Sequence, residues 1–388
     1  MQASDLATTA IQKKSPATDS RHVGIELLRI LAMLMVVTLH FLGHGGILKA
    51  SAPGSVQFAA AWALETFCYV AVNCYVLISG YFLVTSQFKL KKLVILWLQV
   101  AVFSAGIYAA FVILGRAPLT LDNLFLNLLP IVMRRYWFAS IYIALYLLFP
   151  FLNKAIHAIS KTQLRLLLIV LLLFSCAWRS LWPLLGDFNP GGGTNIPWFI
   201  CLYVTAAYLR LYGKQRIGKY RYLAGYLCCC AVLLCTRLLG HGGAGTELHY
   251  SYHSIFVYLA SVCLFLFFTH VGIRSRIAAR TILFVAPLTF GVYLISDNPY
   301  VRDILYTSVW HVSRYFSSPQ LWPMLIVWIL ATFCICAAVE YLRKRIFRPL
   351  EQSRWLDRLC IRISTYKFFT EKSSVPGMEQ PGEGKDNG

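Results

Sequence analysis

The chain has 388 residues, of which 58% are hydrophobic and only 13% are charged, and its mean hydropathy is +0.61. A soluble domain of this size does not need so much apolar surface, whereas a polytopic membrane protein does. The apolar runs are continuous and about 20 residues long. They exclude a transmembrane β-barrel, because barrel strands alternate with period two. The composition therefore predicts an all-α polytopic membrane protein.

Long apolar segments recur along the chain and predict about ten transmembrane helices. They cover residues 24–43, 59–85, 93–114, 137–153, 164–182, 197–213, 222–240, 254–270, 281–298 and 321–342. If residue 1 is cytoplasmic, the loops that face inwards carry most of the lysines and arginines. The cations of the outward loops are then Lys49, Arg116, Arg134, Arg135, Arg302 and Arg314. This bias follows the positive-inside rule and predicts that both termini are cytoplasmic.

Composition divides the chain into four parts. Residues 1–21 are a polar cytoplasmic segment, and residues 22–345 hold the transmembrane domain. Residues 346–370 mix basic and apolar side chains, as an interfacial amphipathic helix does, and the polar residues 371–388 are predicted to be a disordered cytoplasmic tail. The net charge of +20 is explained by the inward loops, so we expect no nucleic-acid partner.

Three ionisable residues, Glu26, Arg29 and His40, stand on the first apolar segment. His40 follows Arg29 by eleven positions, or about three helical turns, so the two side chains lie nearly in register and ~16 Å apart along the axis. A charge inside a bilayer is costly, and residues that remain charged there usually serve a functional site. The spacing therefore predicts that one face of this helix forms the wall of an active site.

Each of these residues also has a structural interpretation. His40 titrates near neutral pH and can act as a general base or pass on a proton, but an isolated histidine is often a hydrogen-bonded core residue. Glu26 and Arg29 can form an interfacial ion pair, or the fork of Arg29 can hold a phosphate. His44 lies one turn beyond His40, but spacing identifies no third ligand, so we predict no metal site.

Four segments together resemble the acyltransferase-3 family of integral membrane acyltransferases, which modify cell-surface glycans and related acceptors. They are Glu26–Ala32 with Val36–His40, Val72–Leu83 with its Ser79-Gly80-Tyr81 turn, Tyr136–Phe138 leading to Leu145–Leu152, and Gly291–Asn298. The first segment holds the arginine and histidine of the family's signature helix. The resemblance covers roughly residues 22–345 and identifies this part as an acyltransferase domain.

Two positions depart from the family pattern. The family often has two arginines three positions apart after the second helix, where this chain has Lys89 and Lys92. Lysine meets phosphate as a point charge but lacks the bidentate fork. The late helix often carries a histidine where this chain has Ser296. We therefore expect the chain either to work without that histidine or to use Asp297 instead.

The resemblance implies an O-acetyltransferase-like enzyme whose donor is acetyl-CoA or another acyl-CoA, supplied from the cytoplasm, with no permanently bound cofactor. It assigns catalysis to His40, Arg29 and Glu26. The residues expected at the donor site are Arg29, Lys89, Lys92, Ser79, Asn73 and Trp137. Direct transfer to the acceptor and an acyl-histidine step both remain open.

The acceptor implied by the resemblance is a hydroxyl of a cell-surface polysaccharide or lipid-linked glycan. Asp187, Asp297 and Asn298 are the candidates on the acceptor side. We expect a multi-pass protein of the bacterial cytoplasmic membrane, and the sequence leaves homo-oligomerisation open. Two other classes compete with the enzyme: a transporter or flippase of a glycan or lipid precursor, and a structural subunit. In a structural subunit Arg29 and His40 would matter only for folding.

Overall fold

The computed structural model describes residues 16–177, 191–213, 218–240 and 250–364. Within these ranges every regular element is a helix, and seven helical stretches are long and apolar enough to cross a membrane. The all-α polytopic membrane class predicted from composition is therefore confirmed.

The seven stretches coincide with predicted apolar segments. They are α1 (Pro16–Gly43, apolar from Val23), α3 with α4 (Val56–Cys68, Ala71–Leu83), α5 (Leu90–Ile113), α7 (Trp137–Ala158), α11 (Lys219–Leu239), α14 with α15 (Arg276–Val285, Thr289–Ser296) and α17 (Leu321–Glu351). The other predicted segments fall on α8 (Lys161–Leu172), which continues as a π-helix over Leu173–Ala177, and on the shorter apolar helices α10 (Ile196–Tyr212) and α13 (Ile255–Thr269). Short helices α2 (Ile47–Ala50), α6 (Leu121–Leu128), α16 (Pro299–Ile304) and α18 (Arg354–Ser364) complete the elements used below.

Two of the predicted segments contain an interruption, and one runs further than expected. The segment 59–85 is split where α3 ends at Cys68, and 281–298 contains a short 3-10 helix, Ala286–Leu288, because Pro287 cannot donate a helical hydrogen bond. The last span does not stop at residue 342 but continues as α17 to Glu351. Residues 346–351 thus continue α17, and α18 is a separate helix within the segment expected to be interfacial.

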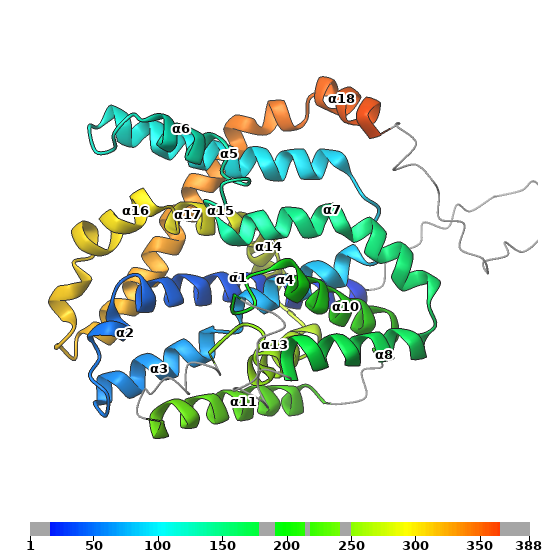
Figure 1. Ribbon diagram of the computed structural model, residues 1–388, viewed down its shortest axis with the longest axis horizontal. Coiled ribbons are helices and arrows are strands. Elements are labelled where there is room, and N and C mark those ends of the chain that lie inside the picture. The colour runs from blue at the N-terminus through cyan, green and yellow to red at the C-terminus, as the bar shows by residue number, and fades with distance from the viewer. Residues whose placement is uncertain (1–15, 178–190, 214–217, 241–249, 365–388) are drawn as a thin grey trace, which may run out of the picture.

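Helix α1 lies at the centre of the bundle. It contacts α3, α4, α13, α14, α15 and α17, and Figure 1 shows it running through the middle of the molecule. Leu28, Ala32 and Phe41 are completely buried along its length. A helix enclosed on several sides can carry polar groups that a lipid-facing helix could not. The fold thus protects the residues of α1 from lipid.

The shorter helix α10 fits between its neighbours because small residues let the backbones approach. A Cβ atom added to Gly80 of α4 would lie 2.9 Å from the Cβ atom of Ala206 and 3.2 Å from the Cα atom of Tyr203, both on α10. Small residues permit such close packing between membrane helices. Trp198, Phe199 and Leu202 of α10 are completely buried, so this helix is enclosed by protein.

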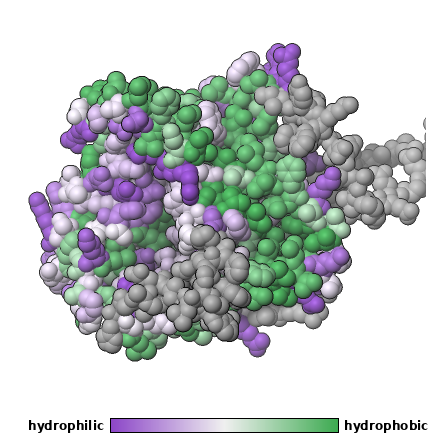
Figure 2. Space-filling view, in the orientation of Figure 1, coloured by the Kyte–Doolittle hydropathy of each residue, from purple (hydrophilic) through white to green (hydrophobic). Residues whose placement is uncertain are grey.

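The outer helices expose apolar side chains instead. Ile326 and Leu330 of α17 and Leu166 and Ile169 of α8 are at least half exposed. Figure 2 shows a broad hydrophobic area over one half of the molecular face. Such a continuous apolar surface would be unfavourable in water and is the surface that lipid chains cover in a bilayer.

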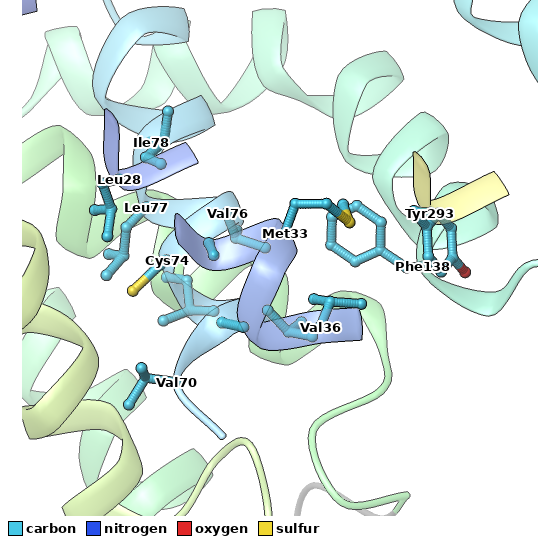
Figure 3. Packing of buried hydrophobic residues seen from close by; sticks show 14 of the residues in the cluster. Leu28, Met33, Val36, Val70, Cys74, Val76, Leu77, Ile78, Phe138 and Tyr293 are labelled. Atoms are coloured by element: carbon cyan, nitrogen blue, oxygen red, sulfur yellow. The ribbon is translucent and has the colours of Figure 1, made fainter. Parts of the chain in front are cut away.

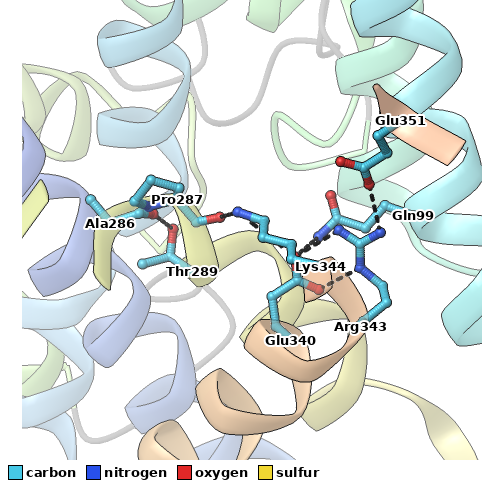
Figure 4. Close-up of polar contacts among 8 residues, drawn as sticks. All are labelled: Gln99, Ala286, Pro287, Thr289, Glu340, Arg343, Lys344 and Glu351. Atoms are coloured by element: carbon cyan, nitrogen blue, oxygen red, sulfur yellow. Dashed lines mark hydrogen bonds and ion pairs between the residues drawn. The ribbon is translucent and has the colours of Figure 1, made fainter. Parts of the chain in front are cut away.

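A buried ionic cluster joins α17 to α5 and to the interrupted helix α14–α15 (Figure 4). The fully buried carboxylate of Glu340 accepts hydrogen bonds from Arg343 Nε at 2.8 Å, Arg343 Nη2 at 2.9 Å and Gln99 Nε2 at 3.1 Å. Lys344 Nζ donates to the carbonyl of Pro287 at 2.6 Å. A Cβ atom on Gly291 would meet Glu340 Cγ at 2.5 Å, so only glycine allows α15 to approach so closely.

Replacement of Arg343 by alanine should destabilise the protein strongly, because Glu340 would remain buried without its main partner. Breaking a buried ion pair on one side costs about 3–5 kcal/mol. The measurement is the midpoint of thermal unfolding in detergent. Arg345→Ala is the matched control, since Arg345 is exposed on the same helix and donates only to the hydroxyl of Tyr341. Equal midpoints for the two variants would contradict this role of the cluster.

Candidate active site

One face of α1 lines a cavity of about 70 Å³. Met33, Val36, Leu39 and His40 form the α1 side of the cavity. The other walls are Val72, Tyr75, Trp137, Phe138, Tyr252, Phe290 and Tyr293. Figure 3 shows Met33 reaching towards Phe138, with Tyr293 on the far side. Arg29 lies on the same helical face as Met33 and His40, because these positions are separated by whole turns.

His40 faces a carboxylate across this site. Its Nε2 atom lies 3.7 Å from Oδ1 of Asp297, and both side chains are largely buried. Its Nδ1 atom is buried and has no hydrogen-bond partner among the described residues. The structure therefore brings together two residues that the sequence analysis assigned to different roles, His40 to catalysis and Asp297 to the acceptor side.

Two more groups converge on the same carboxylate oxygen. Nε2 of His44 lies 3.7 Å from Asp297 Oδ1, and Nη1 of Arg302 lies 3.6 Å from it. Arg302 Nη1 also contacts His44 Nε2 at 3.2 Å. The ligand atoms of His40, His44 and Asp297 lie within 4.8 Å of one another, as in a metal site. Arg302 already supplies a positive charge at this point, however, which disfavours a cation there.

Turn chemistry holds Asp297 in place. Helix α15 ends at Ser296, and the backbone N–H of Asp297 donates to the carbonyl of Tyr293 at 3.0 Å. Asn298 caps α16 by accepting from the N–H of Tyr300 at 3.1 Å, and its Nδ2 donates to the hydroxyl of Tyr136 at 2.7 Å. Asn298 is completely buried. It was a candidate for acceptor binding, but its side chain is used to fix the turn that presents Asp297.

Burial dominates the electrostatics of this carboxylate. Removal from water raises the pKa of Asp297 from 3.8 to about 6, although the positive charges of His44 and Arg302 oppose the shift. Burial and the charge of Arg302 lower the pKa of His44. An acid whose pKa lies near 6 is still ionised at neutral pH, so Asp297 can accept a hydrogen bond from a histidine ring.

Arg29 forms the other end of the site. Its Nη2 lies 3.3 Å from Glu26 Oε1, and both side chains are partly exposed. The hydroxyl of Tyr75, a residue of the cavity wall, donates to the carbonyl of Arg29 at 2.9 Å. Arg29 Nε is buried without a hydrogen-bond partner among the described residues. The guanidinium therefore retains donors for an anionic group, and the ion pair with Glu26 predicted from their spacing is present.

Of the other residues expected at the donor site, some line the cavity and some do not. Trp137 lines the cavity with His40. Asn73 does not: its Nδ2 donates to the carbonyl of Tyr252, and its Oδ1 accepts from Trp198 Nε1. Both of its groups are used inside the protein. Ser79 donates to the carbonyl of Tyr75 within α4 and is not in the cavity wall.

Lys89 and Lys92 are exposed at the start of α5. Figure 1 shows this start at the same end of the bundle as the beginning of α1, and hence on the side of Arg29. Lys91 between them is held by Asp357 of α18 at 2.6 Å. Lys89 and Lys92 thus remain available to an anion. Asp187, the last candidate for the acceptor side, lies outside the described residues.

Sequence reasoning did not assign Tyr293 or Arg302 to the site. Tyr293 was noted only as part of a motif, and Arg302 only as an outward cation. The hydroxyl of Tyr293 is buried at the cavity and faces the side chain of Asp297. A signal for Tyr293 existed in its position one helical turn before Asp297. No comparable signal marked Arg302, because its place beside His44 depends on how α16 packs.

A comparison with known families identifies the family of the chain. The family model for the acyltransferase domain of acyltransferase-3 type matches residues 22–341, which is most of the chain. The chain belongs to this family. No curated protein and no solved structure matches it. The protein is therefore a multi-pass membrane acyltransferase, and the transporter and the structural subunit are the less favoured classes.

Replacement of Asp297 by asparagine should stabilise the protein more at pH 7.5 than at pH 5. Between pH 3.8 and about 6 the folded state keeps a proton that the unfolded state has released, so stability falls as the pH rises through this window. The full loss is about 3 kcal/mol at pH 7.5 and about half of that at pH 5. Asparagine does not titrate and removes this loss.

The measurement is the difference in thermal unfolding midpoint between the wild type and Asp297→Asn at the two pH values. Asp303→Asn is the control, because Asp303 is exposed in α16. A difference that does not change with pH would show that Asp297 has an ordinary pKa in the folded protein.

Proposed function

We propose that the protein is an O-acyltransferase that moves an acetyl group from cytoplasmic acetyl-CoA to a hydroxyl of a cell-surface polysaccharide or lipid-linked glycan. One observation carries this proposal. His40 lines a cavity and lies 3.7 Å from Asp297, and the same face of α1 carries Arg29, whose Nε has no hydrogen-bond partner among the described residues. The family supports acyl transfer, and the geometry supports a base at one end and an anion site at the other.

The donor would bind from the end of the bundle where Arg29, Lys89 and Lys92 lie. The bidentate fork of Arg29 suits a phosphate, and the two exposed lysines add positive charge. The extended arm of coenzyme A would then follow Met33 and Val36 towards His40, about 16 Å along the helix. The apolar wall of the cavity excludes water, which protects the thioester from hydrolysis.

Asp297 determines which nitrogen of His40 acts as the base. Its carboxylate lies on the Nε2 side and favours the tautomer that has its proton on Nε2. The lone pair is then on Nδ1, the atom that has no partner among the described residues. Asp297 also stabilises the imidazolium that forms when His40 accepts a proton. In this proposal Asp297 is an orienting residue, and His40 is the base.

The reaction is balanced without an external proton. Nδ1 of His40 takes the proton of the acceptor hydroxyl as that oxygen attacks the thioester carbonyl. The carbon–sulfur bond breaks, and the proton on His40 passes to the sulfur that leaves as the thiol of coenzyme A. Direct transfer needs only this one base. It therefore requires fewer groups than an acyl-histidine step.

The hydroxyl of Tyr293 is the best-placed donor for the negative charge that develops on the carbonyl oxygen. It is buried in the cavity wall beside Asp297, and in this proposal it turns its hydrogen bond from that carboxylate to the carbonyl oxygen of the thioester. Donors aimed at such an oxyanion are worth about 10²–10³ in rate.

This function places the protein in the bacterial cytoplasmic membrane with both termini in the cytoplasm, as the distribution of lysine and arginine predicts. Its partners are an acyl-CoA, a glycan acceptor and the bilayer. The proposed chemistry needs no resident cofactor. His40 and Asp297 supply the proton transfer, and coenzyme A is released as a product in each turnover. Homo-oligomerisation remains a prediction that nothing in this mechanism requires.

Replacement of His40 by alanine should abolish acyl transfer at an unchanged level of protein in the membrane. The measurement is acetylation of surface polysaccharide in cells, together with release of free coenzyme A from acetyl-CoA by membrane vesicles. His157→Ala is the control, because His157 is exposed near the end of α7. Retained coenzyme A release in His40→Ala would contradict the assignment of the base.

Replacement of Tyr293 by phenylalanine should lower the turnover number about 10²-fold and change the KM for acetyl-CoA little, because the lost hydrogen bond forms only as the transition state is reached. Steady-state release of coenzyme A measures both quantities. Tyr258→Phe serves as control, since the buried Tyr258 hydroxyl contacts Thr205 and lies outside the cavity wall. A rise in KM alone would instead make Tyr293 a binding residue.

A further inference from the structure

Arginines gather at the end of the bundle opposite the donor side. In Figure 1, α16 and the last turn of α1 lie at the end away from the beginning of α5. Figure 2 shows hydrophilic side chains gathered over this part of the face. Three of the six cations that the sequence assigns to outward loops, Arg134, Arg135 and Arg302, belong to this region. Positive charge is otherwise concentrated on the inward side, so its presence here needs an explanation.

Arg135 is the one of these three arginines that is half-buried and has no ion-pair partner among the described residues. Its Nε atom is buried without a hydrogen-bond partner within the same ranges. Its guanidinium lies 5.0 Å from the ring centre of Tyr300 in α16, and that contact does not use the N–H donors in the guanidinium plane. The ring of Tyr300 thus positions the guanidinium of Arg135, while no carboxylate among the described residues pairs with its charge.

The fold fixes Arg135 beside the turn that carries Asp297 and Asn298. The next residue, Tyr136, is completely buried and accepts the hydrogen bond from Asn298, which follows Asp297 directly. The preceding residue, Arg134, has a left-handed backbone with φ of 51°. Such a conformation is unfavourable for a side chain of this size and persists only where the surroundings impose it. Arg135 therefore stands at a specified position rather than on a free loop.

Arg302 adds a second positive charge two residues after Tyr300. It is partly exposed and lies 3.6 Å from Asp297 Oδ1, while Asp303, the carboxylate of α16 itself, is exposed. Asp297 is almost fully buried among His40, His44 and Arg302 and offsets one positive charge. The charge of Arg135 remains. Arg135, Tyr300 and Arg302 together form a cationic and aromatic surface beside the turn that carries Asp297, the neighbour of His40.

From this arrangement we infer that the acceptor is an anionic glycan, which binds with its carboxylate or phosphate group on Arg135 and presents a neighbouring hydroxyl to His40. The planar fork of arginine suits both anions. This inference rests on the proposed function only in calling the ligand an acceptor. It adds to that function the chemical class of the substrate.

Binding of matched small sugars tests the inference. The full chain in nanodiscs is titrated with methyl β-glucuronide, glucose 6-phosphate and methyl β-glucoside, and each Kd is measured by saturation-transfer NMR. We expect the two anionic sugars to bind about tenfold more tightly than the neutral one, as a charge-assisted hydrogen bond provides. Tight binding of only one anionic sugar also supports the inference and tells whether the acceptor carries a carboxylate or a phosphate.

Variants assign the effect to Arg135. Arg135→Gln should raise the Kd of the anionic sugars about tenfold and leave the Kd of the neutral sugar unchanged. Arg135→Lys should retain most of the preference for anionic sugars. Lys49→Gln, at an exposed outward lysine of α2, should change nothing. Equal Kd values for charged and neutral sugars, absence of binding by all three, or an equal loss for charged and neutral sugars in Arg135→Gln would each overturn the inference.

The proposed function fails on a different measurement. If wild-type vesicles release coenzyme A in a His40-dependent manner while anionic sugars show no preference, the acyltransferase mechanism stands and the anionic acceptor is wrong. If anionic sugars bind through Arg135 but no coenzyme A is released, the binding site stands and the mechanism is wrong.

Discussion

The burial of one carboxylate, Asp297, organises the site of this protein. An ionised carboxylate away from water requires positive or polar partners, and His40, His44 and Arg302 all lie 3.6–3.7 Å from its Oδ1 atom. These partners come from α1, from the turn after it and from α16. The electrostatic requirement of a single oxygen therefore joins two distant parts of the chain and places His40 beside a carboxylate at the cavity.

Helix α1 can carry this chemistry because other helices enclose it. Three charges or potential charges on one lipid-facing helix would be costly, whereas α1 contacts six of its neighbours among the longer helices. The interrupted helix α14–α15 completes the enclosure. Lys344 of α17 donates to the carbonyl of Pro287, and Gly291 of α15 lies directly against the buried Glu340. The stability of the buried ionic cluster around Glu340 and the position of Tyr293 and Asp297 are thus linked by packing.

The two ends of the cavity differ in the anions that they suit. On the side where α1 and α5 begin, we propose that Arg29 and the exposed lysines of α5 bind a nucleotide phosphate. At the other end Arg135 and Arg302 flank Tyr300, where we infer an anionic sugar. The walls between them are apolar and aromatic.

Much of this protein follows from the sequence alone. Continuous apolar segments determine an all-α membrane protein, because a helix is the form in which such a segment satisfies its own backbone in lipid. The eleven-position spacing determines that Arg29 and His40 share a face, because the helical period is a local property. The ion pair of Glu26 and Arg29 follows from their i, i+3 spacing for the same reason. The family resemblance carried by these segments is also a property of the sequence.

Tertiary structure decided the rest. Only the packing of α15 against α1, with α16 following it, shows that Asp297 belongs with His40 and that Arg302 joins them. Contacts between distant parts of the chain likewise show that the side chains of Asn73 and Asn298 are used within the protein. His40, Asn73 and Asn298 are more than a hundred positions from their partners in the sequence. Arg302 is near Asp297 in the sequence but meets it only because of the turn between α15 and α16. The helical period of a segment does not indicate which distant helix will contact it, because that contact depends on how all the helices pack together.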